Sequence, residues 1–227
     1  MFARYVRAYF LDTKDDYEKN SKYKYGFIYP TAKSIITLLR LLNLIEWLKV
    51  FSGYFYLFCN GEDASKDGDR KAKSIAIDVY MILKWGLVLF AIYYQVSSTI
   101  MGYVIWYLIA SNLFSYFYYH AWSGILPVKK DLPHQQRRFL AFMLSLAFYL
   151  VCYAYLYEYQ YSDLIAWPDG CVNTTNALYL SVATAFTLTY GGFQPLVQEA
   201  RVLFASELIN TFFFFVIILS KSIPDSE

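Results

Sequence analysis

The sequence predicts an all-α membrane protein with four transmembrane helices and, between the last two, a short helix that is followed by an extended loop. Three observations lead to this fold class. Of the 227 residues, 58% are hydrophobic and only 17% are charged, against about 25% in a typical soluble domain. Residues 85–128 contain no Asp, Glu, Lys or Arg, and neither do residues 139–157. A further apolar stretch at 177–186 is shorter than the roughly 20 residues that cross a bilayer.

Residues 1–73 are mixed in charge and are expected to form a cytosolic N-terminal region. Within it, the apolar segment 34–58 is interrupted by Arg40, Glu46 and Lys49, so no uncharged run is long enough to span a membrane. We expect an interfacial helix at about 34–58, which lies on the membrane surface or against the base of the protein. A further membrane span over the same residues is the alternative.

The uncharged stretch 85–128 holds 44 residues, which is long enough for two spanning helices. Small polar residues at 97–99 and Gly102 predict the turn between them. We therefore expect a two-helix transmembrane hairpin within residues 74–122, with spans at about 75–96 and 103–122. A basic cytosolic loop at 123–138 follows. Neither span repeats Arg or Lys at every third position, so the hairpin is not expected to sense voltage.

Two further spans are predicted at 139–157, which is uncharged, and at 202–220, where Glu207 is the single acid. The 44 residues between them are polar at both ends and apolar in the middle. We expect a short helix at 175–186, with its N-cap among residues 173–176, followed by extended chain. Extended chain at membrane depth has to be buried in protein or line a water-filled cavity.

The distribution of Lys and Arg orients the predicted spans. Cytoplasmic loops carry an excess of these residues. One side of the predicted bundle has eight of them: Arg70, Lys71, Lys73, Lys129, Lys130, Arg137, Arg138 and Lys221. The loop between the last two spans has Arg201 alone. Both termini are therefore expected in the cytoplasm, and the loop after the short helix is expected to open to the outside.

That loop begins with Thr187, Leu188, Thr189, Tyr190 and Gly191. This segment resembles the T-V-G-Y-G loop of the potassium-channel superfamily, whose backbone carbonyl oxygens replace the hydration shell of a permeating ion. The similarity extends to the neighbouring sequence. Residues 177–182 are similar to the pore helix of that family, Pro195 follows the last filter glycine by four residues, and residues 199–208 resemble the start of its inner helix.

The resemblance covers about residues 139–221 and implies a pore domain. Its parts would be an outer helix at 139–157, a re-entrant pore helix at 175–186, a selectivity filter at 187–191 and an inner helix at 202–220. The family builds one filter from four loops, and this chain has one, so a closed homotetramer is implied. The permeating ion would be K⁺, with Na⁺ as a second possibility, and no other metal or cofactor is implied.

Thr189 is the main departure from the family, which usually has glycine at this position. The filter backbone requires left-handed geometry, which costs an ordinary residue about 1–2 kcal/mol. We expect weakened discrimination between K⁺ and Na⁺. Three positions that would support the filter differ as well. Ala183 stands where many relatives have Glu or Val, Phe186 replaces a common Thr, and Gly192 replaces the usual Asp.

The resemblance also implies candidates for the lining or gate of the pore on the inner helix: Glu207, Thr211, Phe214, Phe215 and Ile218. Thr211 stands where a hinge glycine is usual, which makes a bend harder. Glu207 has two interpretations. It either makes a polar contact behind the filter or faces the permeation path.

Together these observations predict a multi-pass subunit of a tetrameric channel for monovalent cations in the cell (plasma or inner) membrane. The alternative is a non-conducting membrane assembly or sensor protein that retains a degenerate pore fold. The sequence contains no nucleophile–base set, phosphate loop or HExxH motif, so no enzymatic activity is expected. The net charge of +2 indicates no nucleic-acid partner. The expected partners are membrane lipid, the other subunits and a regulator, of unidentified kind, at residues 1–73.

Overall fold

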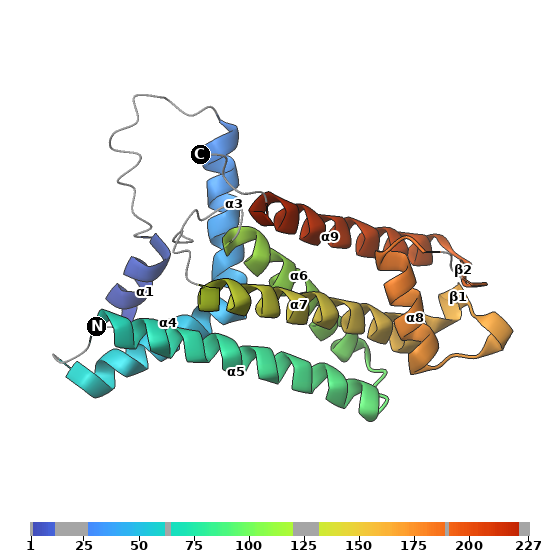
Figure 1. Cartoon of the computed structure of the whole chain (residues 1–227), viewed down its shortest axis with the longest axis horizontal. Helices are drawn as coiled ribbons and strands as arrows, with labels where there is room; N and C mark the ends of the chain where they lie inside the picture. Colours follow the sequence, from blue (N-terminus) through green and yellow to red (C-terminus); the bar gives the residue numbers. More distant parts are fainter. Residues whose placement is uncertain (1, 12–26, 62–64, 120–131, 189–190, 223–227) are drawn as a thin grey trace. The chain divides into compact units, whose positions relative to one another are not determined.

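The computed structural model describes residues 2–11, 27–61, 65–119, 132–188 and 191–222. Over these ranges it confirms the predicted all-α class, with eight α-helices and one pair of two-residue strands (Figure 1). The chain divides into two compact units, residues 1–84 and 85–227. Each unit is described by itself below.

The first unit contains α1 (Phe2–Leu11), α3 (Ile28–Leu42), α4 (Leu44–Asn60) and the first part of α5 (Lys66–Tyr93). The single helix expected at about 34–58 is therefore two helices, which meet at Asn43. Asn43 adopts an extended conformation and accepts a hydrogen bond from the Ile45 amide through its side chain, at 3.4 Å. Asparagine is a favoured N-cap residue, which explains why a new helix begins here.

Charged side chains form the centre of the first unit. The buried Glu46 carboxylate contacts Arg40 Nε at 3.2 Å and Lys49 Nζ at 2.9 Å, and both basic residues are buried as well. The Tyr9 hydroxyl donates to the same carboxylate at 3.0 Å. Burial raises the pKa of the Tyr9 phenol, and the neighbouring Glu46 raises it further, so Tyr9 remains a neutral donor.

The outer faces of α3 and α4 are apolar, which is the reverse of a water-soluble domain. The exposed side chains of these two faces are large and hydrophobic: Ile28, Ile35, Leu38, Leu39, Leu42, Leu44, Phe51, Phe55 and Phe58. Their spacing places each set on one side of its helix, opposite the charged cluster. The charges that interrupt the apolar sequence at 34–58 thus lie inside the unit together with Ile36, Ile45 and Val50, and many of its other large hydrophobic residues lie outside.

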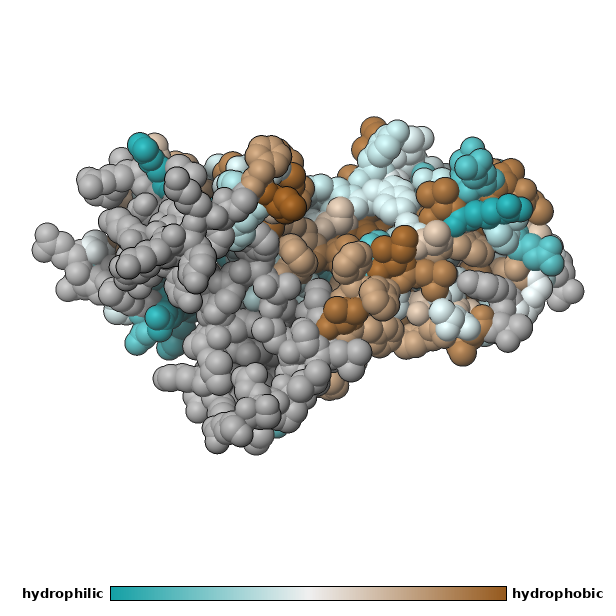
Figure 2. Space-filling model, turned by 90° about the horizontal axis from the view of Figure 1, so that it is seen from above, coloured by the Kyte–Doolittle hydropathy of each residue, from teal (hydrophilic) through white to brown (hydrophobic). Residues whose placement is uncertain are grey.

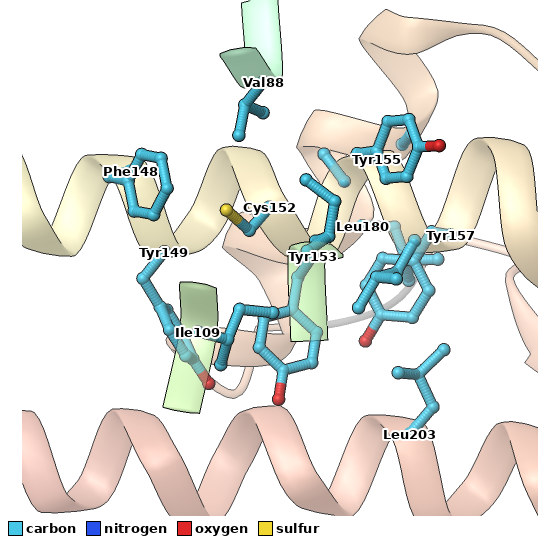
Figure 3. Close-up of a cluster of buried hydrophobic side chains, with 14 of the residues drawn as sticks. Val88, Ile109, Phe148, Tyr149, Cys152, Tyr153, Tyr155, Tyr157, Leu180 and Leu203 are labelled. Atoms are coloured by element: carbon cyan, nitrogen blue, oxygen red, sulfur yellow. The ribbon is translucent and has the colours of Figure 1, made fainter. Parts of the chain in front are cut away.

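The second unit contains the end of α5, the long helices α6 (Thr99–Phe117), α7 (Leu132–Tyr155) and α9 (Gln198–Ser222), and the short helix α8 (Thr174–Ala185). Its core is rich in aromatic side chains that α7 contributes (Figure 3). Asn112 of α6 donates to the Ser145 carbonyl of α7 at 3.3 Å, as expected for a polar contact between packed membrane helices.

Three helical segments among the described residues are long and apolar enough to cross a membrane: 67–93, 99–117 and 139–160. They indicate a multi-pass membrane protein. The first two spans were expected at 75–96 and 103–122, and both helical segments begin earlier. Ser98 is the N-cap of α6 and accepts from the Met101 amide at 3.3 Å, so the helix begins within the expected turn.

Hydrophobic side chains cover much of the visible surface that the described residues form (Figure 2). Exposed examples in the second unit lie on all three candidate spans: Leu87, Leu89, Phe90, Ile100, Tyr103, Phe139, Leu140 and Leu144. Exposed apolar surface of this extent has to be covered, and a lipid bilayer covers the outer surface of spanning helices.

Candidate functional site

The short helix α8 lies between the end of α7 and the start of α9 (Figure 1). A π-helical turn, η3 (Leu156–Gln160), continues α7 toward it. Asn173 is the N-cap of α8, and its side chain accepts from the Asn176 amide at 2.8 Å. The helix therefore begins at the polar cluster that follows Cys171 and ends at the apolar residues before Thr187.

The end of α8 is a Schellman motif. The Leu188 amide donates to the Ala183 carbonyl at 2.7 Å, and the Thr187 amide donates to the Thr184 carbonyl at 3.1 Å. Thr187 occupies the left-handed position with φ +55°. Glycine is usual there, and a β-branched residue is strained by about 1–2 kcal/mol. Strain of this kind is found where the surrounding structure enforces it, often at functional sites.

Replacing Thr187 with glycine is expected to stabilise the end of α8 by about 0.5–1 kcal/mol, because glycine adopts φ +55° without the Cβ clash. Slower hydrogen–deuterium exchange of the Leu188 amide would report this gain. Thr187→Ala is the control, since it removes the branch but keeps the Cβ, and its gain should be smaller. Equal or faster exchange in the glycine variant would show that the threonine conformation is unstrained.

Two glycines redirect the chain at the last residue of the segment that resembles a filter and at the residue after it. Gly191 has φ +53° and Gly192 has φ +97°, which other residues adopt only with strain. A Cβ on Gly192 would meet Pro168 no closer than 3.7 Å, so the backbone angle, not space, favours glycine.

The chain then returns in an extended conformation. Strand β2 (Gln194–Pro195) pairs antiparallel with β1 (Ile165–Ala166), and the Leu196 amide donates to the Leu164 carbonyl at 3.0 Å. Phe193 is buried just before β2, with its ring centroid 5.5 Å from that of Trp167. Both sides of residues 187–192 are therefore fixed, by the cap of α8 before them and by these contacts after them.

Glu207 of α9 is fully buried and joins three elements. Its two carboxylate oxygens accept from the Ser181 hydroxyl of α8 at 2.5 Å and from the Tyr157 hydroxyl of η3 at 2.6 Å. Of the two interpretations of Glu207, the contacts favour a polar contact behind the loop. Within the described parts of the chain, no basic side chain forms an ion pair with this carboxylate.

Three tyrosines on one side of α7 and η3 point their hydroxyls toward α9 (Figure 3). Tyr149 donates to the Glu207 carbonyl at 2.8 Å, Tyr153 bonds the Ser206 hydroxyl at 3.0 Å, and Tyr157 bonds the Glu207 carboxylate. Neither these tyrosines nor Ser181 were predicted as site residues from the sequence. The four-residue spacing of 149, 153 and 157 was the available indication, because residues at i, i+4 and i+8 share a helix face.

The inner-helix candidates lie mainly on the packed face of α9. Glu207, Thr211 and Phe214 are all buried within one chain, and the Ile218 side chain is outside the described residues. Phe215 is half-buried, with its ring 5.8 Å from that of Phe186. The exposed face of the helix carries a different set: Val202, Ile209, Phe212, Phe213 and Val216.

The residues that resemble a filter are only partly described. Thr189 and Tyr190 lie outside the described residues, so the geometry expected at Thr189 stays a prediction. Thr187 and Leu188 are exposed on the surface of the single chain, as is Gly191. Of the proposed supports, Ala183 is buried and Phe186 is exposed. No group of three or more His, Cys, Asp or Glu side chains that could hold a metal ion occurs in the described part of the chain.

Comparisons of this chain with protein-family models, with curated proteins and with solved structures give no match.

Proposed function

We propose that this chain is a subunit of a homotetrameric channel for monovalent cations, in which residues 187–191 of four chains form the filter. One observation carries the proposal. A short capped helix, α8, packs against the long helices α7 and α9, and after the turn at Gly191 and Gly192 the chain continues into strand β2. A loop of this form can offer backbone carbonyls to an ion while its own polar groups stay away from lipid.

The direction of α8 supports cation binding. The carboxyl end of a helix carries a partial negative charge, and in α8 this end leads directly into Thr187 and Leu188. Four such ends around one axis would favour a cation there. In this proposal α9 is the fourth span and the inner helix, and its exposed face, which includes Ile209 and Phe212, lines the pore or contacts neighbouring subunits.

Electrical recording tests the proposed function. Full-length protein in planar bilayers, with K⁺ on one side and Na⁺ on the other, is expected to carry cation current with a weak preference for K⁺. Thr189→Gly should raise the permeability ratio of K⁺ to Na⁺ by about tenfold, because it removes the strain expected in the filter. Thr175→Gly, at the other end of α8, is the control and should leave the ratio unchanged.

Two results of the bilayer recording would contradict what is expected. Strong K⁺ selectivity in the wild-type protein would contradict the interpretation of Thr189. Absence of current from protein that is shown to be tetrameric would favour the alternative, a non-conducting assembly or sensor protein.

We further propose that the outer faces of α3 and α4 contact the acyl chains of the bilayer. The charged cluster is sealed inside this unit and the exposed side chains are apolar, an arrangement that suits lipid and not water. In α5, Ile75, Ile82 and Leu83 are also exposed, within a candidate span.

Spin labels measure this contact. In a background without native cysteines, a label at Phe55→Cys in nanodiscs should be more accessible to oxygen than to a water-soluble nickel chelate. A label at Asp67→Cys, on an exposed charged residue, should show the reverse. Access of the chelate to position 55 would place this face in water, and protection from both reagents would indicate a protein partner.

A further inference from the structure

We infer that Glu207 is a positioning residue, which fixes the end of α8, and with it residues 187–191, relative to α9. The inference rests on the proposed function for its effect on ion selection. Its structural part depends only on contacts among described residues. We expect Glu207 to act on the loop through α8, without touching a permeating ion.

Two short hydrogen bonds make Glu207 a junction. Ser181 donates from α8 at 2.5 Å, Tyr157 donates from η3 at 2.6 Å, and the carboxyl itself belongs to α9. Each oxygen thus has a donor from a different element. In a fully buried site, moving any one of the three elements leaves a polar group unsatisfied.

Ser181 connects the Glu207 side chain to the helix that leads into the loop. Its Oγ also lies 2.9 Å from the Leu150 carbonyl oxygen of α7, so this hydroxyl lies where α7, α8 and α9 meet. Ser181 precedes the left-handed Thr187 by six residues, and a capped helix connects the two. A rotation or slide of α8 at Ser181 would therefore displace Thr187 and the residues after it.

Tyr153 provides a matched comparison. It is a buried tyrosine of α7, four residues before Tyr157 of η3, and its hydroxyl bonds Ser206, the residue of α9 next to Glu207. Asn210 of α9 donates to it at 3.1 Å. Tyr153→Phe therefore removes contacts between α7 and α9 but none that the hydroxyl makes to α8. Tyr157→Phe and Ser181→Ala each remove one bond to the Glu207 carboxylate.

The test uses full-length protein in nanodiscs and reads hydrogen–deuterium exchange of the amides at 174–188. Ser181→Ala, Tyr157→Phe and Glu207→Leu are each expected to accelerate this exchange by about tenfold or more, and Tyr153→Phe to leave it unchanged. Glu207→Gln retains polar atoms of the same shape and should restore most of the protection lost in Glu207→Leu. Wild-type exchange in Glu207→Leu would overturn the inference, and so would equal acceleration by Tyr153→Phe and Tyr157→Phe.

Bilayer recording of the same variants separates this inference from the proposed function. Ser181→Ala, Tyr157→Phe and Glu207→Leu should each change the permeability ratio of K⁺ to Na⁺ by about threefold or more, whereas Tyr153→Phe should not. If the wild-type protein carries no current but the exchange pattern is as expected, Glu207 still positions α8 and the channel proposal fails. If the protein conducts and all variants keep the wild-type ratio, the inferred effect of Glu207 on the filter is wrong.

Discussion

Alanine at Phe214 is expected to destabilise the second unit by about 3–5 kcal/mol, the typical effect of removing a fully buried aromatic ring. Phe214 has no exposed surface. Its ring centroid lies 5.6 Å from that of Tyr116, 6.1 Å from that of Phe142 and 5.4 Å from that of Tyr149. The substitution would leave a cavity where α6, α7 and α9 meet. Thermal unfolding of the protein in nanodiscs measures the loss.

Phe213→Ala is the matched control, because it removes the same ring from the neighbouring residue of α9. Phe213 is 47% exposed, so the fold should be little affected. If the exposed face of α9 lines a pore or a subunit contact, Phe213→Ala should instead change conductance or tetramer stability. Similar unfolding temperatures for the two variants would contradict the assignment of buried and exposed faces.

Alanine at Glu46 is expected to have an effect of similar size on the first unit, about 3–5 kcal/mol. Glu46 lies at the centre of the charged cluster, and its removal leaves Arg40 and Lys49 buried without this carboxylate. Burying a charge without its partner is costly because the protein interior solvates it poorly. Hydrogen–deuterium exchange of the amides at 28–60 would report the loss as local opening of α3 and α4.

Asp67→Ala controls for the loss of an acidic residue in the same unit. Asp67 pairs with Arg70 at 3.6 Å, but both side chains are largely exposed, and such pairs contribute little. Exchange at 28–60 should stay at the wild-type rate. Equal effects of the two substitutions would indicate that the Glu46 cluster is solvated.

Local sequence rules predicted much of α8. Asn173 is a strong N-cap residue, and the apolar residues after Ala177 are helical, so the expected helix at 175–186 and the observed 174–185 differ by one residue at each end. The candidate spans 99–117 and 139–160 followed from long uncharged runs, whereas the candidate span 67–93 begins among charged residues. These features depend on neighbouring residues in sequence, which is why they can be predicted without knowledge of the tertiary contacts.

The faces of α9 could not be predicted in the same way. The helix is apolar on all sides, so periodicity gives no indication of which side packs against α7. The contacts of Glu207 show which side of α9 is packed. These contacts depend on Ser181 and Tyr157, which are 26 and 50 residues away in sequence. The expected inner-helix candidates Thr211 and Phe214 share the buried side with Glu207.

The N-terminal region differs from expectation for a related reason. The charges at 40, 46 and 49 suggested contact with water, since charged residues are mostly exposed. In the structure Glu46 pairs with both Arg40 and Lys49 inside the unit, and Asn43 divides the segment into two helices. Sequence patterns do not reveal such pairing, because it depends on how α3 and α4 fold together.

The tyrosine contacts between α7 and α9 restrict where α9 can bend. The hydroxyls of Tyr149, Tyr153 and Tyr157 contact α9 at residues 206, 207 and 210. These contacts lie within about one helical turn of α9, so this turn should move together with α7. A hinge in α9 would therefore lie beyond residue 210, toward its C-terminal half. The residues before the hinge would keep their distance from the loop while the residues after it move.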